Sequence, residues 1–271
     1  MRNIRRYRFH TLLLCAIVIT ILAFLGPALA PENPNQTNLE KLMQPPAAGN
    51  ILGTDYLGRD LLSRVLNGAR NSFALTLVMV IFVAFIGTFI GLVAGFTGGT
   101  VDSAVMQVTD ILLAFPTVVF AMAVSGIWGP GIYRVLSAIA IVSWAKYAKL
   151  ARSLILDIRS KEYVTQARFA GSRRRHILFK YLLPNILPQI MVITTSDFSE
   201  MMVTLSALSF LGMVSSPYVP EWGSMLAENR AYLMTYPYMM LCPGIALLIP
   251  VVLFSLLGDS LRDVLDPKVK K

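Results

Sequence analysis

The chain has 271 residues, of which 55% are hydrophobic and 14% are charged, whereas a typical soluble domain has about 45–50% apolar and about 25% charged residues. One soluble core cannot bury this excess, and the apolar residues gather instead in six segments of about 19 to 26 residues, each long enough to cross the ~30 Å hydrocarbon core of a bilayer as a helix. The formal net charge is +9, but the basic residues lie between the apolar segments, as in the cytoplasmic loops of membrane proteins, so we expect no nucleic-acid partner.

We therefore expect an all-α, polytopic membrane protein with six transmembrane helices in one domain over residues 11–268, and no separate soluble domain. Eighteen of the 24 Lys and Arg residues fall within residues 1–10, 146–180 and 259–271. Because Lys and Arg are enriched on the cytoplasmic side, this distribution predicts that both termini are cytoplasmic. The expected spans, in chain order, are 11–29, 72–96, 103–125, 135–154, 186–211 and 238–257.

The first expected span admits two interpretations. Four arginines within residues 1–10, followed by an apolar run and the small residues around Ala28, also fit a cleavable signal peptide. The apolar run of about 19 residues is long for a signal peptide, so we expect a retained membrane anchor behind a short cytoplasmic tail.

Residues 30–71 form the expected outer segment, which is rich in proline and polar residues up to Asn50 and ends in an amphipathic stretch at 60–70. Its charged residues alternate in sign, which predicts ion pairs that fix a surface helix and leaves docking of a binding protein as a further role. These residues are Asp55, Arg59, Asp60 and Arg64.

Acidic residues inside the expected spans are informative because a charge at the bilayer centre is costly and normally faces a bundle interior or a watery cavity. Asp110 stands near one end of its span, and we interpret it as a buried hydrogen-bonding or helix-end partner. Asp197 and Glu200 are three residues apart, so they share one helix face with Met201, and Met202 is adjacent. These four residues from 197 to 202 are the candidate translocation pathway. The alternatives are packing against the Arg or Lys of a partner subunit, and direct coordination of a metal by oxygen and sulfur.

The connection 151–184 is longer than a helix hairpin needs and is itself patterned as two helices. Ser160 is the expected N-cap of the first helix, and Gly171 supplies the left-handed residue that ends it. Pro184 is expected to stop the second helix. An apolar surface for docking is expected from Tyr163, Ala167 and Phe169. The other interpretation is a solvated basic loop on anionic lipid headgroups.

The stretch from Glu162 to Gly171 (EYVTQARFAG) resembles the EAA loop of ABC importer permeases, with Gln166 in place of the first alanine of the pair. Further motifs resemble the peptide and nickel permeases of the second membrane-subunit type: LGTDYLGRDLLSR at 52–64, LSFLG at 208–212 with EWG at 221–223, and GDSLRDVLDP at 258–267. Together these motifs extend over nearly the whole chain.

The resemblance implies the type I permease fold of an ABC importer, with a cytoplasmic coupling helix that fits a cleft of the ATP-hydrolysing subunit. The residues it assigns to ATPase coupling are Glu162, Tyr163, Ala167 and Gly171. It also implies a homologous second permease subunit, two ATP-binding subunits, an extracytoplasmic substrate-binding protein and a place in a bacterial plasma (inner) membrane. No glycine-rich loop followed by Lys and Ser or Thr, the pattern that cradles phosphates, occurs in the sequence. We therefore expect no cofactor in this chain and ATP bound by the partners.

The sequence favours nickel or a metal chelate as cargo, with di- or oligopeptides as the alternative. Peptide permeases carry a Glu where this chain has Leu205, and the stretch DFSEMM at 197–202 looks more like the nickel permeases. Metal ligands are not assigned.

Two other classes of protein are weighed against a permease. Ser143 and Lys146 have the S-x-x-K spacing of a nucleophile and its base, which a membrane-bound hydrolase could use. Lys146 near a membrane interface is more simply a snorkelling side chain, so we expect no enzyme. A stand-alone channel would conduct without ATP.

The motif at 221–223 is expected to hold a short outer helix, with Trp222 at the outer membrane interface.

Overall fold

The computed structural model describes residues 2–214 and 219–265 of the chain, and these residues form helices and loops without a β-strand. The expectation of an all-α membrane protein is confirmed. The GDSLRDVLDP motif and the expected C-terminal tail extend beyond residue 265, and their last residues lie outside the described part. The α-helices are α1 (Arg2–Leu29), α2 (Leu61–Thr97), α3 (Gly99–Leu113), α4 (Thr117–Trp128), α5 (Ile132–Arg159), α6 (Glu162–Phe169), α7 (Arg174–His176), α8 (Leu183–Phe210), α9 (Trp222–Asn229) and α10 (Tyr238–Leu265).

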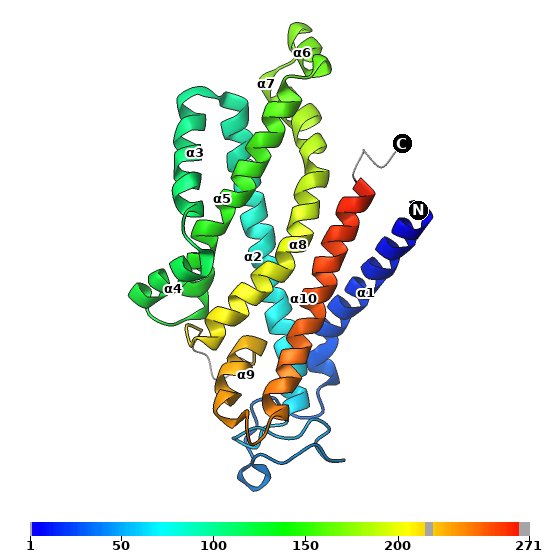
Figure 1. Ribbon diagram of the computed structural model, residues 1–271, viewed down its shortest axis with the longest axis vertical. Coiled ribbons are helices and arrows are strands. Elements are labelled where there is room, and N and C mark those ends of the chain that lie inside the picture. The colour runs from blue at the N-terminus through cyan, green and yellow to red at the C-terminus, as the bar shows by residue number, and fades with distance from the viewer. Residues whose placement is uncertain (1, 215–218, 266–271) are drawn as a thin grey trace.

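The long helices lie beside one another in an elongated bundle (Figure 1). Helices α6 and α7 project from one end of the bundle, which we call the α6 end. Helix α9 and the irregular segment 30–60 cover the other end, the α9 end. The start of α1 and the end of α10 both lie toward the α6 end. The two expected cytoplasmic termini therefore lie toward the same end as the expected coupling loop.

Four helices in the described part of the chain are long and apolar enough to cross a membrane, namely Arg5–Leu29, Leu61–Thr97, Arg174–Phe210 and Tyr238–Leu265. A fifth candidate is the pair α3 and α4. Helix α5 has sufficient length but carries the basic residues Lys146, Lys149 and Arg152. The expected number of six spans therefore depends on including α5 and the α3–α4 pair.

The expected span 103–125 is not one straight helix. It divides into α3 and α4, which are bent by 87° at the break between Leu113 and Thr117. Pro116 is the cause, because it lacks a backbone N–H and disfavours the helical conformation of the residue before it.

Helix α2 begins earlier than expected, so the amphipathic stretch 60–70 is not a separate surface helix. Its residues form the first turns of α2, which runs for 37 residues. The Asp60 side chain caps this helix by accepting a hydrogen bond of 2.7 Å from the backbone N–H of Ser63. The outer segment consequently ends at Asp60.

Two predictions about the connection 151–184 are wrong. Ser160 does not cap α6; its hydroxyl donates to the carbonyl of Asp157 at the end of α5, and Lys161 is the N-cap. Pro184 does not stop a helix, because it occupies the first turn of α8 and the preceding residues Ile177–Leu182 form a π-helical turn. Within an α-helix a proline ring clashes with the carbonyl four residues earlier and leaves that carbonyl without its hydrogen bond. The wider π-helical turn accommodates the proline without these two costs.

Helices α2 and α5 pack closely because α2 presents glycines at four-residue intervals toward α5. A side chain at Gly87 or Gly91 would meet the backbone carbonyl of Trp144 or Ala148. Small residues at such spacing let two helix backbones approach in a membrane. The main apolar core lies along this contact and extends to α8, and a second core around Phe73 joins α2 to α8, α9 and α10.

Candidate functional site

A cavity of about 280 Å³ lies where the α3–α4 break meets α5 and α8. Helix α8 supplies the carboxylates of Asp197 and Glu200 and the thioether of Met201. Helix α5 supplies Lys146. The other lining residues are Leu113, Thr117, Val142, Ser143 and Thr204. Charged, sulfur and hydroxyl groups thus meet in one space inside the bundle.

Lys146 contacts both acids of the cavity. Its ammonium Nζ lies 2.7 Å from Oδ1 of Asp197 and 3.1 Å from Oε2 of Glu200. Asp197 is 8% exposed, whereas 69% of the Glu200 side chain is exposed. The cavity therefore holds two negative charges and one positive charge, an arrangement that complements a cationic or zwitterionic molecule better than an anion.

Three of the four predicted pathway residues share this cavity, and the fourth does not. Asp197, Glu200 and Met201 line it, while Met202 is buried in the second apolar core with Phe198. Within the described residues no group of three or more His, Cys, Asp or Glu side chains has the arrangement of a metal site.

Sequence reasoning placed Lys146 at a membrane interface and missed its role as the partner of the two acids. No local signal could have found it, because Lys146 lies 51 residues before Asp197. An ammonium that donates to two carboxylates is already protonated, so it is not poised to act as a base for Ser143.

Two further ion pairs join α3 to α5. Lys149 lies 2.6 Å from Asp110, and Arg152 lies 2.6 Å from Asp102. Asp110 is thus a hydrogen-bonded structural partner, as predicted, although 59% of its side chain is exposed rather than buried. The exposed Lys149–Asp110 pair contributes little to stability, whereas the Arg152–Asp102 pair is partly buried.

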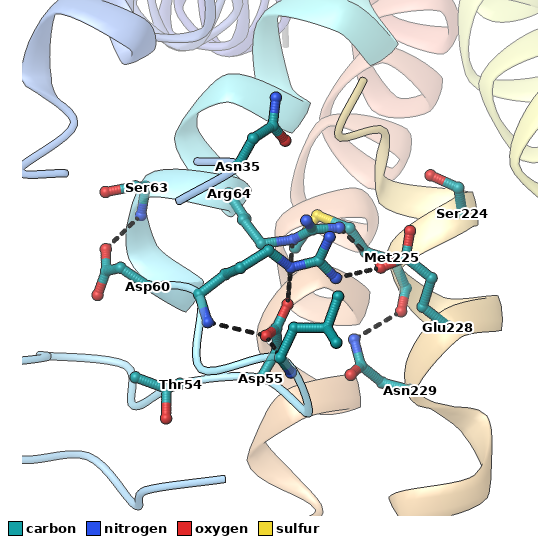
Figure 2. Close-up of polar contacts among 12 residues, drawn as sticks. Asn35, Thr54, Asp55, Asp60, Ser63, Arg64, Ser224, Met225, Glu228 and Asn229 are labelled. Carbon is teal, nitrogen blue, oxygen red and sulfur yellow. Dashed lines mark hydrogen bonds and ion pairs between the residues drawn. The ribbon is translucent and has the colours of Figure 1, made fainter. Parts of the chain in front are cut away.

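A buried ionic cluster at the α9 end joins the outer segment, α2 and α9 (Figure 2). Arg59 and Arg64 each lie 2.8 Å from Oε2 of Glu228 on α9. Asp55 completes the cluster, with Oδ2 2.6 Å from Nε of Arg59 and 3.5 Å from Nε of Arg64. The predicted ion pairs are confirmed for Asp55, Arg59 and Arg64. Asp60 was also expected to form one but caps α2 instead, and Glu228 was not anticipated.

The two acids of this cluster stabilise the charged form of Arg59. Burial alone would lower the pKa of the Arg59 guanidinium, but attraction to Asp55 and Glu228 more than offsets it and raises that pKa. Breaking a buried pair by removing one partner typically costs about 3–5 kcal/mol, because it leaves an uncompensated charge. Glu228 therefore fixes α9 against the outer segment.

Glu221 holds the start of α9. It is 2% exposed, and its carboxylate accepts hydrogen bonds of 3.0 and 2.9 Å from the backbone N–H groups of Gly223 and Ser224. The next residue, Trp222, is buried and donates from Nε1 to the carbonyl of Val65 at 3.0 Å. The short outer helix is as expected, but the prediction that Trp222 lies at the membrane interface is wrong, because the ring packs within the second core.

The element α6 presents a small helix at the opposite end of the molecule. Val164 and Ala167 face inward and are buried, so the prediction that Ala167 belongs to the docking surface is wrong. Glu162 and Tyr163 are exposed, and Phe169 is 87% exposed. The exposed residues of α6 thus offer an acidic group and two aromatic rings to a partner.

Gly171 ends this element in the left-handed conformation, with φ of 79°, as the sequence predicts. The N–H of Gly171 donates to the carbonyl of Arg168, and the N–H of Ser172 to the carbonyl of Ala167, each at 3.1 Å. These bonds satisfy carbonyls that the end of a helix would leave free.

Comparisons with known proteins show which family this chain resembles. The family model described as the binding-protein-dependent transport system inner membrane component matches residues 87–271. The chain is 38% identical over 264 residues to a di/tripeptide transport system permease protein of Pseudomonas aeruginosa, covering 95% of this chain and 87% of that one. It is 35% identical over 262 residues to a nickel transport system permease protein of Escherichia coli K12, with coverage of 97% and 95%. A glutathione transport system permease protein of Pectobacterium atrosepticum is 37% identical over 258 residues, with coverage of 95% and 86%.

Proposed function

Because the chain belongs to the family of binding-protein-dependent transport system inner membrane components, and within it to the peptide and nickel permeases of ABC importers, we propose that it forms one half of a translocation pathway in a bacterial inner membrane. The chain is a permease subunit and not an enzyme. In the proposed assembly it pairs with a homologous second permease, two subunits that bind and hydrolyse ATP, and an extracytoplasmic binding protein that delivers the cargo.

The α6 end of the bundle is the proposed cytoplasmic end. The basic loop 159–180, which contains α6 and α7, lies there, and the first residues of α1 and the last of α10 lie toward it. In this orientation residues 1–10 and 259–271 are cytoplasmic tails of one transmembrane domain over residues 11–268, and α9 with the outer segment faces the binding protein.

The coupling function is assigned to α6 and the turn that ends it. Glu162 and Tyr163 are exposed where an ATP-binding subunit would contact them, Ala167 anchors α6 to the rest of the chain, and Gly171 sets the exit of the element. Closure of the ATP-binding subunits would move this element, and α5 and α8 would transmit the motion because the connection 151–184 joins them.

We propose that the cavity beside the α3–α4 break is part of the translocation pathway. Its two acids, Asp197 and Glu200, are the residues that test this proposal. We expect Asp197→Asn to lower ATP-dependent uptake roughly tenfold or more, since a hydrogen bond to a charged group contributes about 1.5–3 kcal/mol. Uptake is measured per amount of assembled complex. Asp110→Asn, which removes an exposed acid outside the cavity, is the matched control. Equal uptake in the two variants would show that Asp197 is only a packing residue.

The proposed cargo is a small molecule that carries both a cationic and an anionic group, such as a short peptide with free termini. The observation behind this proposal is that Lys146 lies between Asp197 and Glu200, so the cavity offers sites for an ammonium and for a carboxylate. Relatives named for di/tripeptide transport and for glutathione transport are consistent with it. The nickel expectation is retained as the second candidate, since the Met201 thioether and two carboxylates share the cavity and one relative is named for nickel transport.

Uptake by cells with and without the gene separates these cargoes. We expect deletion to abolish accumulation of a radiolabelled dipeptide, and excess nickel or nickel chelate not to compete with it. If deletion abolishes nickel accumulation instead, and unlabelled dipeptide does not compete, the cargo is the metal or its chelate and the peptide proposal is rejected.

A further inference from the structure

The cation-binding position of the cavity is already occupied by a side chain of the protein itself. The acids on α8 are three residues apart, so their carboxylates repel each other unless a cation lies near them. Lys146 supplies this cation from α5, at 2.7 and 3.1 Å from the two carboxylates. The adjoining space of about 280 Å³ remains open to a second group.

The choice of lysine fits a contact that has to be exchanged. An ammonium on a flexible four-carbon stem has three rotatable donors, whereas the planar guanidinium of arginine forms a rigid fork that binds a carboxylate with two bonds. The other ion pairs of α5 lie outside this cavity, since Lys149 and Arg152 contact acids of α3. Lys146 is therefore the residue of this helix that can move between the acids and a molecule in the cavity.

We propose that Lys146 is a tethered counter-cation that excludes free metal ions from Asp197 and Glu200 and selects cargo able to replace it. The inference rests on the proposed function of the cavity as part of the pathway. The cationic group of the cargo takes the place of the Lys146 ammonium on the two carboxylates. The released ammonium then pairs with the anionic group of the cargo, so every charge keeps a partner. No bond is made or broken, and a bare metal ion, which has no anionic group to offer Lys146, gains no such exchange.

The first test is independent of the identity of the cargo. Purified, fully assembled importer is titrated with Mn²⁺, a cation that suits carboxylate oxygen ligands, and free Mn²⁺ is followed by electron paramagnetic resonance. We expect Lys146→Met to bind Mn²⁺ about tenfold or more tightly than the unaltered importer does, because removing the ammonium leaves two uncompensated charges in a cleft. Lys149→Met, which removes an equivalent charge outside the cavity, is expected to bind no more than the unaltered importer. Adding Asp197→Asn to Lys146→Met is expected to abolish the increase in Mn²⁺ affinity.

The second test measures selection of cargo in proteoliposomes that contain the complete importer and loaded binding protein. Lys146→Met leaves the anionic group of the cargo without its partner, so we expect slower dipeptide transport. We expect Mn²⁺ to inhibit the remaining transport at a concentration at least about tenfold lower than in Lys149→Met. If Lys146→Met does not assemble, the same two measurements are made on Lys146→Gln, which keeps a polar side chain. Lys146→Arg keeps the positive charge and is expected to leave Mn²⁺ unbound.

The outcomes separate this inference from the proposed function. Equal Mn²⁺ binding in the Lys146 and Lys149 variants overturns the counter-cation role, whatever the cargo is. Absence of ATP-dependent dipeptide transport by the unaltered importer counts against the proposed cargo alone, and the Mn²⁺ titration then still decides the role of Lys146.

Discussion

Gly91→Leu is expected to prevent the chain from accumulating as a folded permease. A β-carbon at Gly91 would lie against the carbonyl oxygen of Ala148 and 2.8 Å from the carbonyl carbon and Cα of the same residue. Real β-carbons do not approach a backbone so closely, and a backbone cannot rotate away as a side chain can. Overpacking a core typically costs about 1–3 kcal/mol, even where side chains can rearrange. Here α2 would have to separate from α5, which would disrupt the core shared by α2, α5 and α8.

The chain contains a matched control for this substitution. Gly126 is an exposed residue of another helix, α4, and nothing lies within 4 Å of a β-carbon built there. We expect Gly126→Leu to accumulate normally, measured as the yield of monodisperse protein after solubilisation.

Substitutions by alanine give a graded version of the experiment. The order of thermal stability should be Gly126→Ala, then Gly95→Ala, then Gly91→Ala. A β-carbon at Gly95 would lie 3.1 Å from the side chain of Ile155 and 3.2 Å from Cα of Arg152, which is less close than the contacts at Gly91. Helix propensity alone would predict stabilisation by up to about 1 kcal/mol at all three positions. Equal stability of the three alanine variants would show that α2 and α5 do not depend on this close approach.

What the sequence predicts well is what local physics determines. The excess of apolar residues predicts the membrane and the helical class, since a bilayer requires every backbone group to be satisfied within a helix or a closed barrel. The left-handed turn at Gly171 follows from the one residue that enters this conformation without a steric penalty. The acids at 197 and 200 can be identified from the sequence because a charge in an apolar span is costly, so it indicates a bundle interior or a watery cavity.

What the sequence misses is the partner of each charge. Lys146 lies 51 residues from Asp197, and Glu228 lies 164 residues from Arg64. Separations this long along the sequence give no helical periodicity that could link the two residues. Only the packing of α5 on α8, or of α9 on α2, brings the charged groups together. A basic residue in a span was therefore assigned to an interface, and Glu228 was not anticipated as a member of the outer cluster.

The boundaries fail for a related reason. Proline is a strong local signal, but its effect depends on the geometry around it. Pro116 breaks the helix at an 87° bend, whereas Pro184 lies in a continuous helix behind a π-helical turn. The sequence alone does not distinguish these two cases, because widening a turn by one residue depends on how the segment packs.

Gly171→Val is expected to reduce the cargo transported per ATP hydrolysed at least about tenfold in the reconstituted importer. Its φ of 79° lies in the left-handed region, where a residue with a β-carbon costs about 1–2 kcal/mol and a β-branched side chain is a true outlier. The backbone would relax, and the hydrogen bonds that end α6 at Arg168 and Ala167 would be lost. The proposed coupling element would then meet the ATP-binding subunit without a fixed orientation, so ATP hydrolysis would continue while cargo movement falls.

The matched variant for this prediction is Gly171→Asn, because asparagine enters the left-handed region far more readily than valine does. No atom lies within 4 Å of a β-carbon built at Gly171, so the two side chains differ in backbone preference and not in available space. We expect Gly171→Asn to retain most of the transport per ATP. Equal coupling in the valine and asparagine variants would show that the turn does not orient α6, and loss in both would indicate that the partner contacts this position directly and tolerates no side chain.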